Sequence, residues 1–149
     1  MAIQAGDKAP DIKAPEFRLA EHRGKRVVLF FYPKSDTPGC TKEACEFRDA
    51  AKTFAKRDAV IVGLSPDKAP AQQKFAAKYD LPFALVPDPD HAIAEAYGVW
   101  VEKSMYGRKY MGIERSTFVV DEKGKIAQAF RKVKPEGHAA QVLEALAGK

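Results

Sequence analysis

Long apolar runs are missing from this chain of 149 residues. Its longest strongly apolar stretch, VVLFFY at positions 27–32, falls far short of the roughly 20 residues that a membrane-spanning helix needs. The first seventeen residues contain neither an apolar signal core nor an amphipathic pattern rich in Arg and Ser, so we expect no targeting peptide. The sequence therefore predicts a cytoplasmic protein that has no membrane as a partner.

Blocks of charge of one sign are missing as well. The 25 basic residues are interspersed with 20 acidic ones, and the net charge is +5. A nucleic-acid-binding surface normally needs a basic cluster, so we expect no nucleic-acid partner. Hydrophobic residues make up 46% of the chain, and it has no repeat, low-complexity tract or linker. We therefore expect one globular domain over residues 1–149.

Cysteine is scarce, with Cys40 and Cys45 as the only two in the chain. Their spacing fits neither a zinc knuckle nor the two-residue gap of the thioredoxin redox motif. In a reducing cytoplasm, two nearby cysteines are more often catalytic than structural. The three histidines show no ligand spacing with them, so neither a metal nor an organic cofactor is predicted. We expect His22 on the surface or in a loop, His91 at a helix start and His138 on a polar helical face.

The order of apolar and amphipathic segments predicts an alternation of strands and helices. Continuous apolar runs such as RVVLFFY and AVIVGLS are typical of strands that are buried on both faces. With one hairpin near the end, this order predicts an α/β fold, a central mixed sheet with helices on both faces. Residues 99–113 carry mixed signals and are predicted to form a loop. The predicted strands are 26–32, 59–65, 83–88, 115–121 and 126–133, and the predicted helices are 37–57, 69–80, 91–98 and 135–149.

The helix predicted from Thr37 places Cys40 in its first turn. Thr37 suits the N-cap, Pro38 suits the first helical position, and Gly39 would let a ligand approach the backbone. A sulfur in a first turn meets unpaired backbone N–H groups and the positive end of the helix dipole, which both favour a thiolate. Cys40 is therefore the candidate nucleophile.

The two sulfurs are expected to point in different directions. At about 100° per residue, Cys40 lies on the inward stripe of the helix and Cys45 about 140° away on the polar side. An ideal helix separates their Cα atoms by about 8.7 Å, whereas a disulfide needs about 4.4–6.8 Å. A disulfide therefore requires the first turns to unwind. From periodicity alone, a redox-active Cys40 and a Cys40 that merely fills the core stay equally open.

The segment FYPKSDTPGCTKEACEFRD resembles the peroxiredoxins, specifically the bacterioferritin comigratory protein or PrxQ type. Pro33, Thr37 and Cys40 match the pattern Pro-x-x-x-Thr-x-x-Cys, and the five-residue cysteine spacing is characteristic of many members of this type. Ser35 stands where many relatives carry aspartate. The resemblance continues in GDKAPDIKAPEF and GVWVEKSMYGRKYMGIERSTFVVDEKGKI, so it covers nearly the whole chain. It implies a thioredoxin-like fold.

The resemblance also implies roles for single residues. Cys40 would be the peroxidatic cysteine and Cys45 the resolving cysteine. Thr37 would hydrogen-bond the sulfur and the peroxide, and Arg115 would stabilise the thiolate. Further candidate residues of the substrate pocket are Pro33, Pro38, Gly39, Glu43 and Arg48.

The function that the resemblance implies is reduction of hydroperoxides through a transient Cys40–Cys45 disulfide. The partners would be the hydroperoxide and thioredoxin or a similar dithiol protein, and the chain would act as a monomer. Two other classes stay open. A thioredoxin-like disulfide oxidoreductase normally places its cysteines two residues apart, and a non-catalytic binding protein or holdase would not need Cys40.

Overall fold

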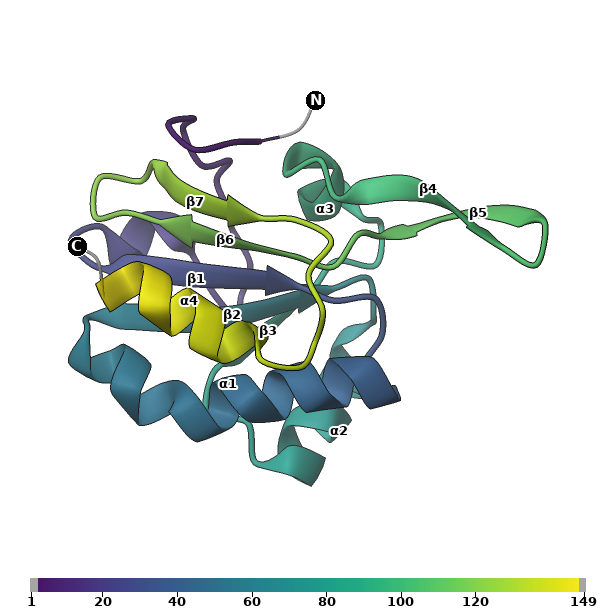
Figure 1. The fold of residues 1–149 in the computed structure, drawn as a ribbon, viewed down its shortest axis with the longest axis horizontal. Coiled ribbons are helices and arrows are strands. Elements are labelled where there is room, and N and C mark those ends of the chain that lie inside the picture. The colour runs from purple at the N-terminus through teal and green to yellow at the C-terminus, as the bar shows by residue number, and fades with distance from the viewer. Residues whose placement is uncertain (1–2, 148–149) are drawn as a thin grey trace.

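The computed structural model describes residues 3–147, in which strands and helices alternate along most of the chain (Figure 1). All the strands and helices predicted from the sequence are present, with bounds that differ by at most three residues within the described range. The last two residues of the helix predicted over 135–149 lie outside that range. The elements are η1 (Leu19–His22), β1 (Arg26–Phe31), α1 (Pro38–Lys56), β2 (Ala59–Ser65), α2 (Ala69–Tyr79), β3 (Ala84–Pro87), α3 (Ala92–Ala96), β4 (Trp100–Met105), β5 (Arg108–Ile113), β6 (Ser116–Val120), β7 (Ile126–Phe130) and α4 (His138–Ala147).

The prediction of a loop over residues 99–113 is wrong, because this segment forms the β4–β5 hairpin. The two strands pair antiparallel from Trp100 opposite Ile113 to Met105 opposite Arg108. Tyr106 and Gly107 form the turn with φ of 51° and 77°, and two positive values are typical of tight hairpin turns. The hairpin projects from the body of the protein (Figure 1). With little core to pack against, it lacks the alternation of apolar and polar residues that would have indicated strands.

The five other strands form one mixed sheet in the order β3-β2-β1-β6-β7. β1 pairs parallel with β2, and β2 pairs parallel with β3. β6 pairs antiparallel with β1 and with β7. The prediction of a central mixed sheet is therefore confirmed, and β1 lies in its middle.

The two faces of the sheet are covered differently. On one face, α1 and α4 pack together with Phe75 of α2, and the ring of Phe30 in β1 stacks on Phe47 of α1 with centroids 4.8 Å apart. The other face is covered by the N-terminal segment and α3, where Tyr97 packs on Phe31. Helices thus lie on both faces, but an extended segment does much of the covering on the second. Within residues 3–147, no helix combines the length and apolar character needed to cross a membrane.

Gly63 in β2 gives a test of how tightly the first face is packed. A Cβ at this position would lie 2.7 Å from Leu85 Cδ2 and 2.8 Å from Phe30 Cζ. We expect Gly63→Ala to lower the free energy of unfolding by about 1–3 kcal/mol through overpacking, measured by urea denaturation. Gly112→Ala is the control, because its Cβ would meet its nearest neighbours only at 3.4 Å. An equal loss in both variants would contradict close packing at Gly63.

Candidate active site

Cys40 lies in the first turn of α1, which begins shortly after β1 ends. Pro38 occupies the first helical position, which its fixed φ suits. The side chain of Cys40 faces the sheet and belongs to the same core cluster as Ala44 and Phe47. Only 1% of Cys40 is exposed. The predicted inward direction of Cys40 is therefore confirmed.

Arg115 reaches Cys40 from the residue just before β6. Phe31 at the end of β1 lies opposite Ser116, so the start of β6 is beside the start of α1. Arg115 Nη2 lies 3.2 Å from Cys40 Sγ and donates to it. Its Nη1 donates to Glu43 Oε1 at 2.8 Å. The fold thus brings Arg115 to Cys40 and Glu43 of α1, three candidate residues from two segments that are far apart in the sequence.

Glu43 lies one helical turn after Cys40 and has no exposed surface. Burial raises the pKa of its carboxyl to about 7, and the charge of Arg115 and its hydrogen bond oppose that rise. Within residues 3–147, its second oxygen Oε2 has no hydrogen-bond partner. Burial also disfavours the charge of Arg115, but Glu43 and the Cys40 sulfur hold the pKa of the guanidinium above its usual value. Arg115 is therefore a permanent cation, and Glu43 is the member of the pair that titrates.

Gly39 lets the guanidinium of Arg115 lie against the helix start. A Cβ on Gly39 would lie 3.3 Å from Arg115 Nη2 and 3.4 Å from Pro135 Cγ. The backbone N–H of Val133 donates to the carbonyl of Arg115 at 3.0 Å. The segment that leads into α4 therefore packs over the arginine, a contact for which the sequence carried no signal. The close approach that Gly39 permits is to a protein side chain.

Thr37 takes the N-cap position of α1, as predicted, but its side chain makes no capping hydrogen bond. Its hydroxyl donates instead to the carbonyl of Lys34 at 2.7 Å. The hydroxyl proton is therefore committed to the backbone. The lone pairs of Oγ1 remain free to accept a hydrogen bond from another donor.

The loop between β1 and α1 is held by buried polar contacts that were not predicted. The hydroxyls of Tyr32 and Ser35 are 3.0 Å apart, and the backbone N–H of Ser35 donates to Asp67 at 2.7 Å. Ser65 in β2 also donates to Asp67 at 2.7 Å. Burial raises the pKa of Tyr32 to about 12, so its hydroxyl stays neutral. Ser35 therefore has a structural role, and Pro33 lies half-buried in the same loop.

Cys45 lies on a different face of α1 and is half-buried, and both cysteines are free. It borders an open hollow of about 520 Å³ that Thr37, Pro38 and Tyr79 also line. Arg48, one turn further, donates to the carbonyl of Tyr79 at 2.8 Å and to Asp49 at 3.0 Å. These contacts correct the expected placement of Arg48. It belongs with Cys45 and α2, whereas the guanidinium at Cys40 comes from Arg115.

His138 is not on a polar helical face, and that prediction is wrong. It begins α4, is 2% exposed, and its Nε2 lies 2.7 Å from Thr117 Oγ1 on β6. Its Nδ1 lies 3.0 Å from Gln141 Oε1, and burial lowers the pKa of the imidazole. The error arose because the sequence does not reveal that His138 has a hydrogen-bonding partner on a strand. A polar side chain without a visible partner is expected at the surface. His91, in contrast, is at the start of α3 as predicted, and its ring stacks on Trp100.

The chain is similar to known proteins over nearly its whole length. Residues 5–129 match the AhpC/TSA family. The chain belongs to this family. It is 48% identical to peroxiredoxin Bcp of Bacillus subtilis, over 98% of this chain and 96% of that protein. It is also 48% identical to the putative peroxiredoxin bcp of Coxiella burnetii, over 96% of this chain and 98% of that protein.

Solved structures support the same branch of the peroxiredoxins. A structure of Xanthomonas campestris peroxiredoxin Q matches with a TM-score of 0.89 and 40% identity, covering 97% of each chain. Another, at 39% identity and a TM-score of 0.89, covers 97% of this chain and 98% of that one. It is described as a trapped intermediate/ligand complex of the X. campestris bacterioferritin comigratory protein, with insights into alkyl peroxide reduction. The predicted Bcp/PrxQ membership and thioredoxin-like fold are confirmed.

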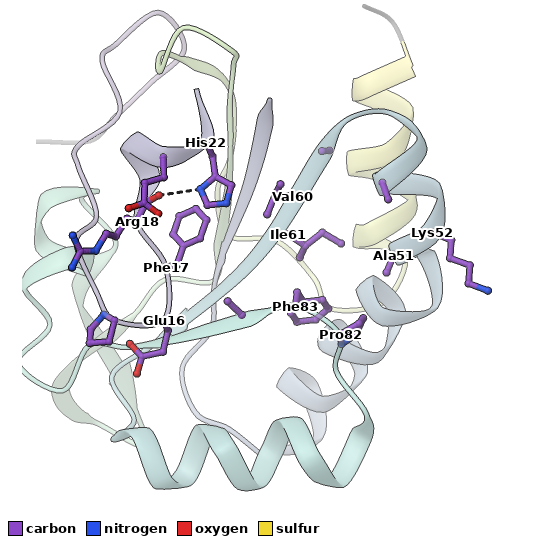
Figure 2. A pocket seen from close by; sticks show the side chains of 15 residues that line it. Glu16, Phe17, Arg18, His22, Ala51, Lys52, Val60, Ile61, Pro82 and Phe83 are labelled. Carbon is purple, nitrogen blue, oxygen red and sulfur yellow. Dashed lines mark hydrogen bonds between the residues drawn. The ribbon is translucent and has the colours of Figure 1, made fainter. Parts of the chain in front are cut away.

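This peroxiredoxin also has a hollow of about 570 Å³ away from Cys40 (Figure 2). It lies between the start of β2, the second half of α1 and the segment of Phe17 and His22, whose rings stack with centroids 4.6 Å apart. Ala51 on its wall is eleven residues from Cys40, which corresponds to about 16 Å along the helix. The hollow is therefore separate from the Cys40 site. No group of three or more His, Cys, Asp or Glu that could hold a metal occurs in residues 3–147.

The titration of Glu43 predicts a pH effect on stability. Because its folded pKa of about 7 exceeds the ordinary glutamate value of 4.5, the folded state binds the proton more tightly than the unfolded state. This contribution is present below pH 4.5 and is lost as the pH rises to about 7. We expect Glu43→Gln to remove this loss. As the pH rises from 5 to 8, the free energy of unfolding of the variant should therefore increase relative to that of the wild type, by up to about 3 kcal/mol.

Urea denaturation at several pH values checks this expectation. Glu144→Gln, which alters an exposed carboxylate on α4, is the control and should follow the wild type across the range. A constant difference between Glu43→Gln and wild type at every pH would show that Glu43 does not titrate in this window.

Proposed function

We propose that this peroxiredoxin reduces hydrogen peroxide and organic hydroperoxides to water and alcohols through Cys40. The observation that carries the proposal is the Arg115 guanidinium, 3.2 Å from the buried sulfur and hydrogen-bonded to Glu43. A fixed cation at this distance favours the thiolate, which is the nucleophilic form of cysteine. Membership of the family implies a peroxide substrate and a thiol reductant.

In the first step, the Cys40 thiolate attacks the terminal oxygen of the hydroperoxide. The O–O bond breaks, the departing oxygen takes up a proton and leaves as water or alcohol, and Cys40 becomes a sulfenic acid. Arg115 stabilises the negative charge that develops on the breaking bond. Since the proton of the Thr37 hydroxyl is donated to Lys34, Thr37 accepts a hydrogen bond from the O–H of the peroxide and orients it.

In the second step, the Cys45 thiol attacks the sulfenic sulfur, and water leaves as the disulfide forms. α1 is continuous from Pro38 to Lys56, and a continuous helix keeps the two Cα atoms about 8.7 Å apart. The first turns must therefore unwind before the bond can form. Pro33, Pro38 and Gly39 shape the segment around Cys40 that has to open.

An external dithiol completes the cycle by reducing the disulfide. We propose thioredoxin or a similar dithiol protein for this step, with the chain acting as a single domain and a monomer in the cytoplasm. The disulfide forms in a segment that has left its helical geometry, so it is exposed to thiol–disulfide exchange. Two electrons and two protons pass to the disulfide, and the reductant leaves in its oxidised form.

Intact mass measured after one equivalent of hydrogen peroxide tests the two cysteine roles. We expect the wild type to lose two hydrogens. Cys45→Ser should hold a sulfenic acid that dimedone traps, because its resolving thiol is absent. Cys40→Ser should react no faster than free cysteine.

Each variant serves as the control for the other. If Cys40→Ser were oxidised as fast as the wild type, the assignment of the nucleophile would be wrong. If no variant reacted faster than free cysteine, the non-catalytic binding protein would become the better interpretation.

Replacement of the arginine tests the electrostatic role. Arg115→Lys keeps a positive charge but cannot contact Cys40 and Glu43 together through one rigid fork. We expect the rate constant for oxidation of Cys40 by hydrogen peroxide to fall by roughly 10²-fold or more, measured by stopped flow. Arg57→Lys at the other end of α1, where the side chain donates to the carbonyl of Leu143, is the matched control. Equal rates in the two variants would rule out a specific role for Arg115.

A further inference from the structure

The β4–β5 hairpin carries an unusual surface. Within residues 3–147, all four large exposed hydrophobic side chains lie on it. Met105 at the end of β4 is 56% exposed and Tyr106 in the turn is 98% exposed. Tyr110 and Met111 of β5 are 43% and 49% exposed. Exposed apolar residues gathered in one place indicate an interaction site more often than isolated ones do.

The two faces of the hairpin differ in charge. Residues that pair across the strands share a face, and successive pairs alternate between the faces. One face, called the basic face below, consists of the pairs Val101–Gly112, Lys103–Tyr110 and Met105–Arg108. It contains two cations and no carboxylate. The opposite face contains the pairs Glu102–Met111 and Ser104–Lys109, in which the charges balance.

The basic face continues to the reactive cysteine. β5 ends at Ile113, two residues before Arg115. Burial lowers the pKa of Lys103, and the charge of Arg115 lowers it further, whereas the Cys40 sulfur and Glu114 act in the opposite direction. Lys103 is therefore close enough to the Cys40 site to interact with its charges. The basic face, which includes Lys103, is therefore the face of the hairpin that borders the Cys40 site.

We propose that the basic face is the docking surface for the dithiol protein that reduces the Cys40–Cys45 disulfide, and that this reductant presents an acidic surface. The inference rests on the proposed function, because it requires the disulfide to form. A thiolate of the reductant attacks one sulfur of the disulfide, and a mixed disulfide forms as the other sulfur is released. Its second thiol then breaks the mixed disulfide, so the enzyme regains two thiols and the reductant leaves as a disulfide.

Charge complementarity selects this occupant over a second copy of the chain. Two copies would bring Lys103 and Arg108 of each basic face together, and the whole chain already carries a net charge of +5. An acidic surface instead pairs with these cations and speeds the encounter. Tyr and Met are enriched in protein interfaces, where a ring or a flexible thioether can adapt to different partners. Tyr110 and Met105 supply such contacts between the two cations.

Two matched double variants test the docking surface. Met105→Ser with Arg108→Ser removes one methionine and one cation from the basic face. Met111→Ser with Lys109→Ser likewise removes one methionine and one cation, in this case from the opposite face. Neither variant alters Lys103, which lies close to Cys40. Each protein is first oxidised with one equivalent of hydrogen peroxide, and disulfide formation is confirmed by intact mass.

Reduction is then followed by rapid quenching, with a purified thioredoxin of net negative charge or with dithiothreitol. We expect the rate constant for reduction by thioredoxin to fall about tenfold or more in the basic-face variant. We also expect this rate constant to vary much less with salt concentration than it does in the wild type. Its rates with dithiothreitol and with peroxide should match the wild type. The opposite-face variant should match the wild type in every assay.

The docking proposal would be overturned if thioredoxin reduced the basic-face variant at the wild-type rate, or if the rate fell equally in both variants. Failure of the wild type to form the disulfide would instead overturn the proposed function, and it would be seen before any reductant is added. The wild type should also sediment as a monomer and should not bind phosphatidylglycerol vesicles. If the wild type formed a dimer and only the basic-face variant lost it, the surface would be assigned to a second copy. If the wild type bound vesicles and only the basic-face variant did not, the surface would be assigned to a membrane.

Discussion

The buried contact of Arg115 with Glu43 and Cys40 is the interaction on which the rest of the site depends. Burying a carboxylate and a guanidinium costs desolvation energy that their attraction often only balances. Here the pair is incompletely satisfied, since Oε2 of Glu43 lacks a partner within residues 3–147 and its pKa rises to about 7. Stability alone does not account for such a pair. Its value is geometric, because Glu43 fixes one edge of the guanidinium and leaves Nη2 directed at the sulfur.

The mixed direction of the strands makes that contact possible. α1 follows β1, so Cys40 lies at the C-terminal end of the central strand, where open α/β sheets commonly place their sites. β6 runs antiparallel to β1 and therefore starts at this same end, with Ser116 opposite Phe31. A parallel β6 would start at the other end of the sheet and carry Arg115 away from the cysteine. His138 then joins the start of α4 to Thr117 on β6, two residues after the arginine.

Features with a local physical cause could be predicted from the sequence. The buried strands, the amphipathic α1, the first-turn position of Cys40 and the different direction of Cys45 follow from periodicity and helix geometry. Contacts between distant segments could not be derived in that way: Arg115 was found only through the family resemblance, and the burial of His138 was missed. The hairpin over residues 100–113 was missed because exposed strands need no apolar alternation. Arg48 was misplaced because its position on the helix does not reveal that its partner is the carbonyl of Tyr79.

In the proposed cycle, the first turn of α1 holds Cys40 in place and releases it after oxidation. By itself this turn is weakly stabilised: the Thr37 side chain makes no cap, no acidic residue occupies the turn, and Gly39 lies within it. A missing cap costs about 0.5–2 kcal/mol, and a helical glycine about 0.5–1 kcal/mol relative to alanine. Burial of Cys40 and its contact with Arg115 therefore hold much of the turn. Oxidation to the sulfenic acid makes the sulfur larger and polar and weakens both. In the proposed cycle, the event that creates the target for Cys45 thus weakens the contacts that keep Cys40 away from it.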